Sequence, residues 1–198
     1  MRSQAMRNPM IGALLAALAS LPAQGAETYG IDPRHAQVVF GYTHFGFSRQ
    51  TGMLRQVSGE LVYDAADPAK SSVSVTIPID ALSTGVPELD QDLKGVNFFD
   101  QAKFPNMTFK STRVEKAGSE ALTVTGDLTL HGVTRPVTLA VKVLKAGEHP
   151  MKKVPMLGFD ATATLKRSEF GIDKFTPAVS DEVDIRIAIE ATQPAAKK

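Results

Sequence analysis

Hydrophobic and polar residues alternate with a period of two along most of the chain, which is the pattern of β-strands with one buried face. In the clearest case, leucine, valine and glycine occupy alternate positions of 122–130, and threonine and aspartate lie between them. The alternation predicts eight strands, over residues 38–43, 59–63, 73–80, 107–114, 122–130, 137–143, 159–165 and 183–189.

Three segments break this alternation. Residues 131–136 contain Gly132 and Pro136 between two predicted strands, and they predict a hairpin turn. Residues 86–95 have proline and acids near their start and glycine at their end, as helices do, and they predict one short helix. Residues 166–177 predict a loop with one helical turn.

Eight antiparallel strands with one apolar face each can form either two packed sheets or one closed barrel. Several runs exceed the roughly five or six residues of an average strand, and long, tilted strands favour the barrel. We therefore expect an all-β fold, an eight-stranded antiparallel β-barrel over residues 26–198 with one or two short helices covering it. Residues 193–198 are expected to form a frayed tail.

The first 25 residues differ from the rest of the chain. They contain Arg2 and Arg7, no acid, an apolar run over 10–21 and the small-x-small triplet 23–25. The apolar run is too short to span a bilayer, and the arrangement is typical of a secretory signal peptide. We therefore expect residues 1–25 to be removed on export, with no lipid anchor and no membrane span left behind.

Charge and cysteine content narrow the function further. The formal charge is +1, and removal of Arg2 and Arg7 would make it −1, so nucleic acid is a poor candidate partner. The chain has no cysteine, which excludes disulfides, thiolate chemistry and zinc–thiolate sites.

Candidate catalytic and metal-binding residues are few. The four histidines fit no compact metal motif, and no G-x-S-x-G sequence is present. Asp90, Asp92 and Asp100 could form an acid–base pair, although acids beside a short helix more often cap it. His44 ends the first alternating run and should point inward at a strand end. Its side chain there could either contact a ligand or make a structural hydrogen bond.

Aromatic residues gather in two places, 40–47 and 98–109. The second group belongs to a segment that should cover one end of a barrel. Such clusters are expected either in a filled core or in an apolar pocket, because ligand sites are lined by these residues with a few polar groups among them. The sequence pattern leaves both readings open.

Several motifs resemble the YceI family, and together they span about residues 28–192. The matching segments are Tyr29-Gly30-Ile31-Asp32-Pro33-Arg34-His35, His44-Phe45-Gly46-Phe47-Ser48, Asn97-Phe98-Phe99-Asp100, Phe104-Pro105 with Phe109-Lys110-Ser111, 126–137 (Gly-Asp-Leu-Thr-Leu-His-Gly-Val-Thr-Arg-Pro-Val) and Arg167-Ser168-Glu169-Phe170-Gly171. Each segment alone is weakly specific, but six of them in the right order are highly specific.

The resemblance implies a lipocalin-like, extended barrel exported to the bacterial periplasm. It also implies a binding or carrier role for a long-chain amphiphile such as a polyisoprenoid, an isoprenoid quinone or a fatty acid or amide, without enzymatic activity and without a cofactor. Contact with a membrane would be transient, and a homodimer stays open. An enzyme acting on the bound lipid through His44 or Asp92, and an interaction module with a filled core, are the alternatives.

The chain departs from the family pattern at one position. Where the family often has R-D-x-H-L-R, this chain reads Leu-Asp-Gln-Asp-Leu-Lys over 89–94, with Asp92 in place of the histidine. If that histidine touches the ligand head group in relatives, an anionic pyrophosphate should bind less well here, and a neutral quinone or amide is favoured.

Two groups of residues are expected to bind the ligand, an apolar wall and a set of polar contacts. The wall comprises Phe40, Tyr42, Phe47, Phe98, Phe99, Phe109, Leu128, Leu130, Phe159 and Phe170. The polar contacts are Tyr42, His44, Ser48, Asp92 and Arg167.

Overall fold

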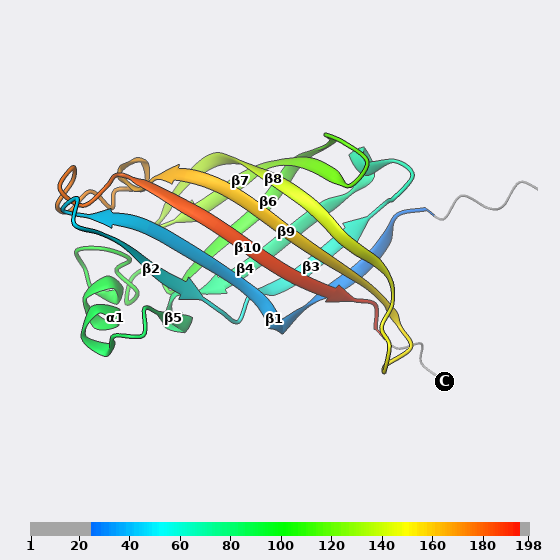
Figure 1. Cartoon of the computed structure of the whole chain (residues 1–198), viewed down its shortest axis with the longest axis horizontal. Helices are drawn as coiled ribbons and strands as arrows, with labels where there is room; N and C mark the ends of the chain where they lie inside the picture. Colours follow the sequence, from blue (N-terminus) through cyan, green and yellow to red (C-terminus); the bar gives the residue numbers. More distant parts are fainter. Residues whose placement is uncertain (1–24, 195–198) are drawn as a thin grey trace, which may run out of the picture.

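The computed structural model describes residues 25–194, which form a closed antiparallel β-barrel (Figure 1). The strands of the ring are β1 (Glu27–His44), β3 (Ser58–Tyr63), β4 (Ser72–Pro78), β6 (Asn106–Lys116), β7 (Ala121–Leu130), β8 (Val133–Glu148), β9 (Pro155–Lys166) and β10 (Glu182–Thr192). Each strand pairs with the next one in this order, and β10 pairs with β1 to close the ring. The expected all-β, eight-stranded barrel is therefore confirmed.

The sequence pattern missed two further strands, β2 and β5. β2 (Ser48–Leu54) pairs with the second half of β1, whereas the predicted strand β3 pairs with the first residues of β1. Thus β2 and β3 together form one long neighbour of β1 that is interrupted at 55–57. The two-residue β5 (Leu82–Ser83) pairs with the end of β2. The first four residues of β2 are all exposed, so they show no alternation that could predict a strand.

Each of the eight predicted runs coincides with a strand, but the bounds differ, and the run 73–80 ends in the 3₁₀ turn that begins at Ile79. β1 begins at Glu27, well before residue 38. The pattern missed its first part because a register shift between Ile31 and Ala36 interrupts the alternation. The hairpin turn consists of His131 and Gly132 alone, with φ of 52° and 74°. The left-handed φ values of these two residues are those that a tight two-residue hairpin requires.

The helical predictions are close to the structure. α1 (Pro87–Lys94) lies within the predicted 86–95, and the loop after β9 contains a single 3₁₀ turn, η3 (Arg167–Phe170). Two further 3₁₀ turns, η1 (Pro68–Lys70) and η2 (Ile79–Ala81), flank β4.

The chain ends need one correction. Gln193 was expected in the frayed tail, but its backbone N–H donates to the Pro155 carbonyl at 3.0 Å and its side-chain amide donates to the Glu27 carboxylate at 2.9 Å. The predicted signal peptide and residues 195–198 lie outside the described residues, apart from Gly25.

The inner faces of the strands form the core. In β7, for example, all five alternate positions from Leu122 to Leu130 are buried. α1, the tip of the β1–β2 hairpin and the loop that contains η3 gather at one end of the barrel, at the left of Figure 1. The opposite end carries the β3–β4 and β8–β9 connections. The fold therefore places helical and loop cover over one end of an apolar interior.

Candidate ligand-binding cavity

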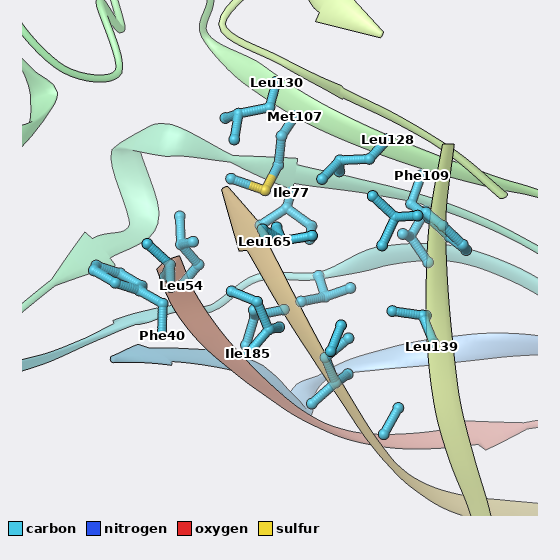
Figure 2. Close-up of a pocket in the computed structure, with 18 of the residues that line it drawn as sticks. Phe40, Leu54, Ile77, Met107, Phe109, Leu128, Leu130, Leu139, Leu165 and Ile185 are labelled. Carbon is cyan, nitrogen blue, oxygen red and sulfur yellow. The ribbon is translucent and has the colours of Figure 1, made fainter. Parts of the chain in front are cut away.

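The barrel encloses a cavity of about 420 Å³. Its wall comes from the inward positions of every ring strand, and Figure 2 shows Phe40, Ile77, Leu128 and Ile185 pointing from different strands into one space. The volume lies in the range of roughly 300 to 1,000 Å³ that holds small-molecule ligands. The filled-core alternative is therefore disfavoured, because it required the absence of a cavity.

The lining is almost wholly aliphatic or phenylalanine. Among the described residues, the lining side chains that carry a polar atom are Tyr42, His44, Tyr63, Ser71, Ser72, Asp92 and Arg167. Four of these residues lie under the loop cover, and the other three lie at the β3–β4 end. The cavity is therefore an apolar tube with polar groups at its two ends.

The covered end forms the mouth of the cavity. The Phe45 backbone N–H donates to the Ala178 carbonyl at 2.8 Å, which joins the β1–β2 tip to the loop after η3. The rings of Phe98 and Phe175 lie 6.5 Å apart and join this loop to the segment after α1. Three separate segments thus surround one opening, and His44 and Asp92, both exposed, line it.

Arg167 holds the mouth loop in place. Its guanidinium donates to the carbonyls of Ser180 (2.9 Å), Ile172 (2.8 Å), Lys174 (3.0 Å) and Val179 (2.8 Å). A guanidinium has five N–H donors, so these bonds leave one for another partner. Burial lowers the pKa of Arg167, although nearby carboxylates oppose the shift. Arg167 therefore supports the loop first and has little capacity left for a ligand.

The far ends of the Phe40 and Phe109 rings lie close against glycines inside the barrel. A Cβ built on Gly52 would come within 2.2 Å of the Phe40 Cζ, and one built on Gly126 within 2.5 Å of the Phe109 Cζ. Rings can pack this closely only because both glycines lack a side chain. The two glycines keep these rings against the wall and out of the lumen.

Tyr42 extends the aromatic surface toward the mouth. Its ring stacks with the Phe40 ring at 6.4 Å between centroids and an interplanar angle of 14°. Burial raises the pKa of Tyr42, and the positive charge of Arg167 opposes part of this shift. The phenol is therefore neutral at physiological pH and can serve there as a hydrogen-bonding group beside an apolar tail.

Of the predicted ligand contacts, most line the cavity. These are Phe40, Tyr42, His44, Asp92, Phe98, Phe99, Phe109, Leu128, Leu130, Phe159, Arg167 and Phe170. Phe47 and Ser48 do not line it. Phe47 is 93% exposed, and the Ser48 hydroxyl accepts a hydrogen bond from the side chain of Gln50. The β1–β2 tip extends beyond the barrel end, so these side chains have no lumen to face.

Asp90, another candidate acid, has a structural role. The Asp90 carboxylate accepts hydrogen bonds from the Thr84 backbone N–H at 2.5 Å and from the Thr84 hydroxyl at 2.7 Å. These bonds lower the pKa of Asp90. Neither Asp90 nor Asp100 lines the cavity, so the structure brings no acid pair together there.

Several lining residues were missed by the sequence analysis. Leu54 ends β2 and Val57 lies in the interruption between β2 and β3, and Leu89, Ile172 and Phe175 come from the cover. None of them belongs to a run with clear period-two alternation. By contrast, Val75, Val124 and Ile187 lie on the predicted inward faces, and strand parity alone could have assigned them.

Residues 25–194 contain neither a metal-binding cluster nor a membrane-spanning helix. No group of three or more His, Asp or Glu side chains in this range converges in a way that could hold a metal ion. No helix in the same range is long and apolar enough to cross a membrane.

The fold and cavity define a class of protein. A closed antiparallel barrel with a long apolar cavity under a helical cover is the lipocalin-like architecture that the sequence motifs led us to expect. Residues 29–191 match the YceI-like domain, and the chain belongs to this family.

Individual relatives agree with this assignment. The chain is 37% identical to Protein YceI of Escherichia coli O157:H7 over 95% of this chain and 99% of that protein. Among solved structures, it is similar to BcnA of Burkholderia cenocepacia, with a TM-score of 0.74 and 28% identity over 82% of this chain and 99% of that chain. A polyisoprenoid-binding domain from Saccharophagus degradans, implicated in plant cell wall breakdown, has a TM-score of 0.63 at 13% identity, over 84% of this chain and 98% of that chain. At this identity the similarity concerns the fold alone.

Proposed function

We propose that this protein is a periplasmic carrier that holds the hydrocarbon tail of a long-chain amphiphile inside its barrel. The observation that carries the proposal is the apolar cavity of about 420 Å³, which runs under the mouth loops and has polar groups only at its ends. Export to the periplasm is part of the proposal and is supported by the basic and apolar pattern of residues 1–25.

The binding energy would come from the tail. Each buried methylene contributes about 0.8 kcal/mol, so ten buried carbons supply about 8 kcal/mol before the cost of ordering the ligand. An alkyl or prenyl tail offers no hydrogen bonds to the wall. The wall therefore cannot distinguish such tails by chemistry, and discrimination falls to the head group and to the tail length.

The polar residues at the mouth favour a neutral head group. Asp92 carries a carboxylate at the opening, and most of the Arg167 donors are already bonded to backbone carbonyls. A pyrophosphate would be repelled by this carboxylate, and only one Arg167 N–H would be left to bind it. An isoprenoid quinone, an alcohol or a fatty amide would meet the Tyr42 hydroxyl and the His44 ring without that repulsion.

Exposed apolar side chains surround the mouth and suggest how a lipid enters. Phe45 (50% exposed), Phe47 (93%), Val96 (75%) and Phe175 (55%) all belong to the segments that form the opening. Clusters of exposed apolar side chains on a protein surface mark sites of contact with partners or membranes. We propose that this rim rests transiently on a lipid surface while the ligand passes into the barrel.

The polyisoprenoid-binding domain from Saccharophagus degradans supports the same ligand class by analogy. Its likeness to this chain is one of fold, and the interior side chains of this chain carry the argument for binding. An isoprenoid is therefore among the first ligands to test, alongside fatty amides and quinones.

Native mass spectrometry tests this proposal. The full chain would be expressed with residues 1–25, purified from the periplasm without detergent, and any adduct would be extracted and identified. A stoichiometric isoprenoid or fatty adduct is expected, and it should be lost in Leu128→Glu, which places a carboxylate in the wall. A protein that stays empty after incubation with quinones, prenyl alcohols and fatty amides would overturn the proposal.

The same experiment separates a carrier from an enzyme. A carrier returns its ligand chemically unchanged. Conversion of a saturating ligand, lost in His44→Ala or in Asp92→Asn, would instead indicate catalysis at the mouth, because both residues line that opening.

A further inference from the structure

A second, more open cavity, of about 310 Å³, lies at the end of the barrel opposite the mouth. The inner positions of three strands lead from one cavity to the other. On β1, Ile31 lines the larger cavity and Tyr29 the smaller one; on β9, Phe159 lines the larger and Leu157 the smaller. The two cavities therefore follow one another along the barrel.

Tyr63 stands between them. It is the only described residue that lines both cavities, and on β3 it follows Leu61, which lines the larger one alone. Its ring packs edge to face against Phe159 with 5.8 Å between ring centroids. Burial raises the pKa of Tyr63, so the side chain that separates the two cavities is a neutral phenol.

The two cavities differ in chemistry. In the smaller one, the Glu27 carboxylate accepts hydrogen bonds from the Tyr29 hydroxyl at 2.8 Å and from the Gln193 amide at 2.9 Å, and Glu148 also lines the wall. A hydrocarbon gains nothing from contact with carboxylates and would displace their water. The apolar environment that favours a tail therefore ends at Tyr63.

We propose that Tyr63 is the floor of the lipid cavity and sets the longest hydrocarbon tail that the protein binds well. The proposal rests on the proposed lipid-binding function and adds a length limit to it. A tail that reaches Tyr63 has used the whole apolar wall, and additional carbons must either bend back or leave through the mouth. A smaller side chain at this position would join the two cavities and admit a longer tail.

The test uses straight-chain primary alcohols of increasing length, measured by displacement of a fluorescent fatty probe from the full-length protein. In the unmodified protein, affinity should rise by about 4-fold per methylene, from about 0.8 kcal/mol each, until the tail reaches Tyr63, and should then level off. In Tyr63→Ala the space left by the phenol ring, beside Phe159, should accept one or two further carbons, so that alcohols just beyond the original limit bind about 4-fold tighter than they bind to the unmodified protein. Tyr63→Trp should move the limit in the opposite direction.

Tyr63→Phe is the matched control, because it keeps the ring and removes only the hydroxyl; its limit should not move. Retained binding of short alcohols shows that each variant is folded, and the tryptophan variant keeps the test decisive if the alanine variant does not fold. If the unmodified protein binds no alcohol in the series, the proposed function fails. If it binds them but the limit is the same in the alanine and tryptophan variants, the lipid cavity stands and the floor assignment is overturned.

Discussion

Gly52 offers a direct test of how the cavity is kept open. This glycine lies opposite Phe40 in the β1–β2 pair, and a Cβ there would lie 2.2, 2.7 and 2.9 Å from three atoms of the Phe40 ring. Carbon atoms pack at about 3.5 to 4.0 Å, so Gly52→Ala must displace the ring by more than about 1 Å. The displacement is directed away from β2 and into the lumen.

Two effects should follow from Gly52→Ala. Overpacking of this kind costs about 1 to 3 kcal/mol, so the free energy of unfolding should fall by that amount. A displaced ring would also exclude one or two methylenes of the ligand, worth about 0.8 kcal/mol each, and so weaken binding by about 4-fold to 15-fold. Urea unfolding measures the first effect, and displacement of a fluorescent fatty probe measures the second.

The chain provides a matched control and a rescue. Gly41 lies next to Phe40 in the same strand, and a Cβ there would meet its nearest atoms at 3.6 to 3.7 Å, which is ordinary contact. Gly41→Ala should therefore change neither stability nor binding by a comparable amount. Phe40→Leu removes the ring, so its combination with Gly52→Ala should lose less than the two single variants added together. Additive losses, or normal stability in Gly52→Ala alone, would refute the reasoning.

Further outcomes follow from other parts of the barrel. Leu128→Glu should abolish ligand retention in native mass spectra, whereas Thr129→Lys, on the outer face of the same strand, should not; equal retention would contradict the wall assignment. Burial and the Glu27 hydrogen bond raise the pKa of Tyr29 to about 12, above its ordinary value of 10.0, so the free energy of unfolding should fall as pH rises from about 10 to about 12. Tyr29→Phe should lessen that fall in urea titrations, and an unchanged pH profile would count against it. Arg167→Lys should speed proteolysis of the mouth loop, because an ammonium cannot reach four carbonyls at once; unchanged cleavage would argue against the supporting role. Phe47→Asp should leave thermal stability within about 0.5 kcal/mol but slow ligand uptake from vesicles, and unchanged uptake would speak against the rim.

Much of the wall could be predicted from single strands. Leu128 and Leu130 were assigned to the interior because they share parity with Leu122 and Val124, and the structure places all four on the inner face. Parity is a local property of an extended backbone and needs no knowledge of neighbouring strands. Phe47 and Ser48 lay beyond any predicted strand and were expected inside only from the aromatic cluster and the family motif; the hairpin tip that carries them extends beyond the barrel and has no interior to face.

The sequence by itself determined the approximate positions of the eight ring strands, which side of each is apolar, the short helix within 86–95 and membership of the YceI family. Only the tertiary structure decided that the inward side chains leave a cavity instead of filling it. That outcome depends on pairs that are distant in the chain, such as Phe109 with Gly126 and Tyr63 with Phe159. Strand closure and tilt set the radius of the barrel, and a hydrophobic pattern carries no information about that radius. The position of Tyr63 between two cavities follows from the same closure, since its contacts come from strands that meet only when the ring is complete.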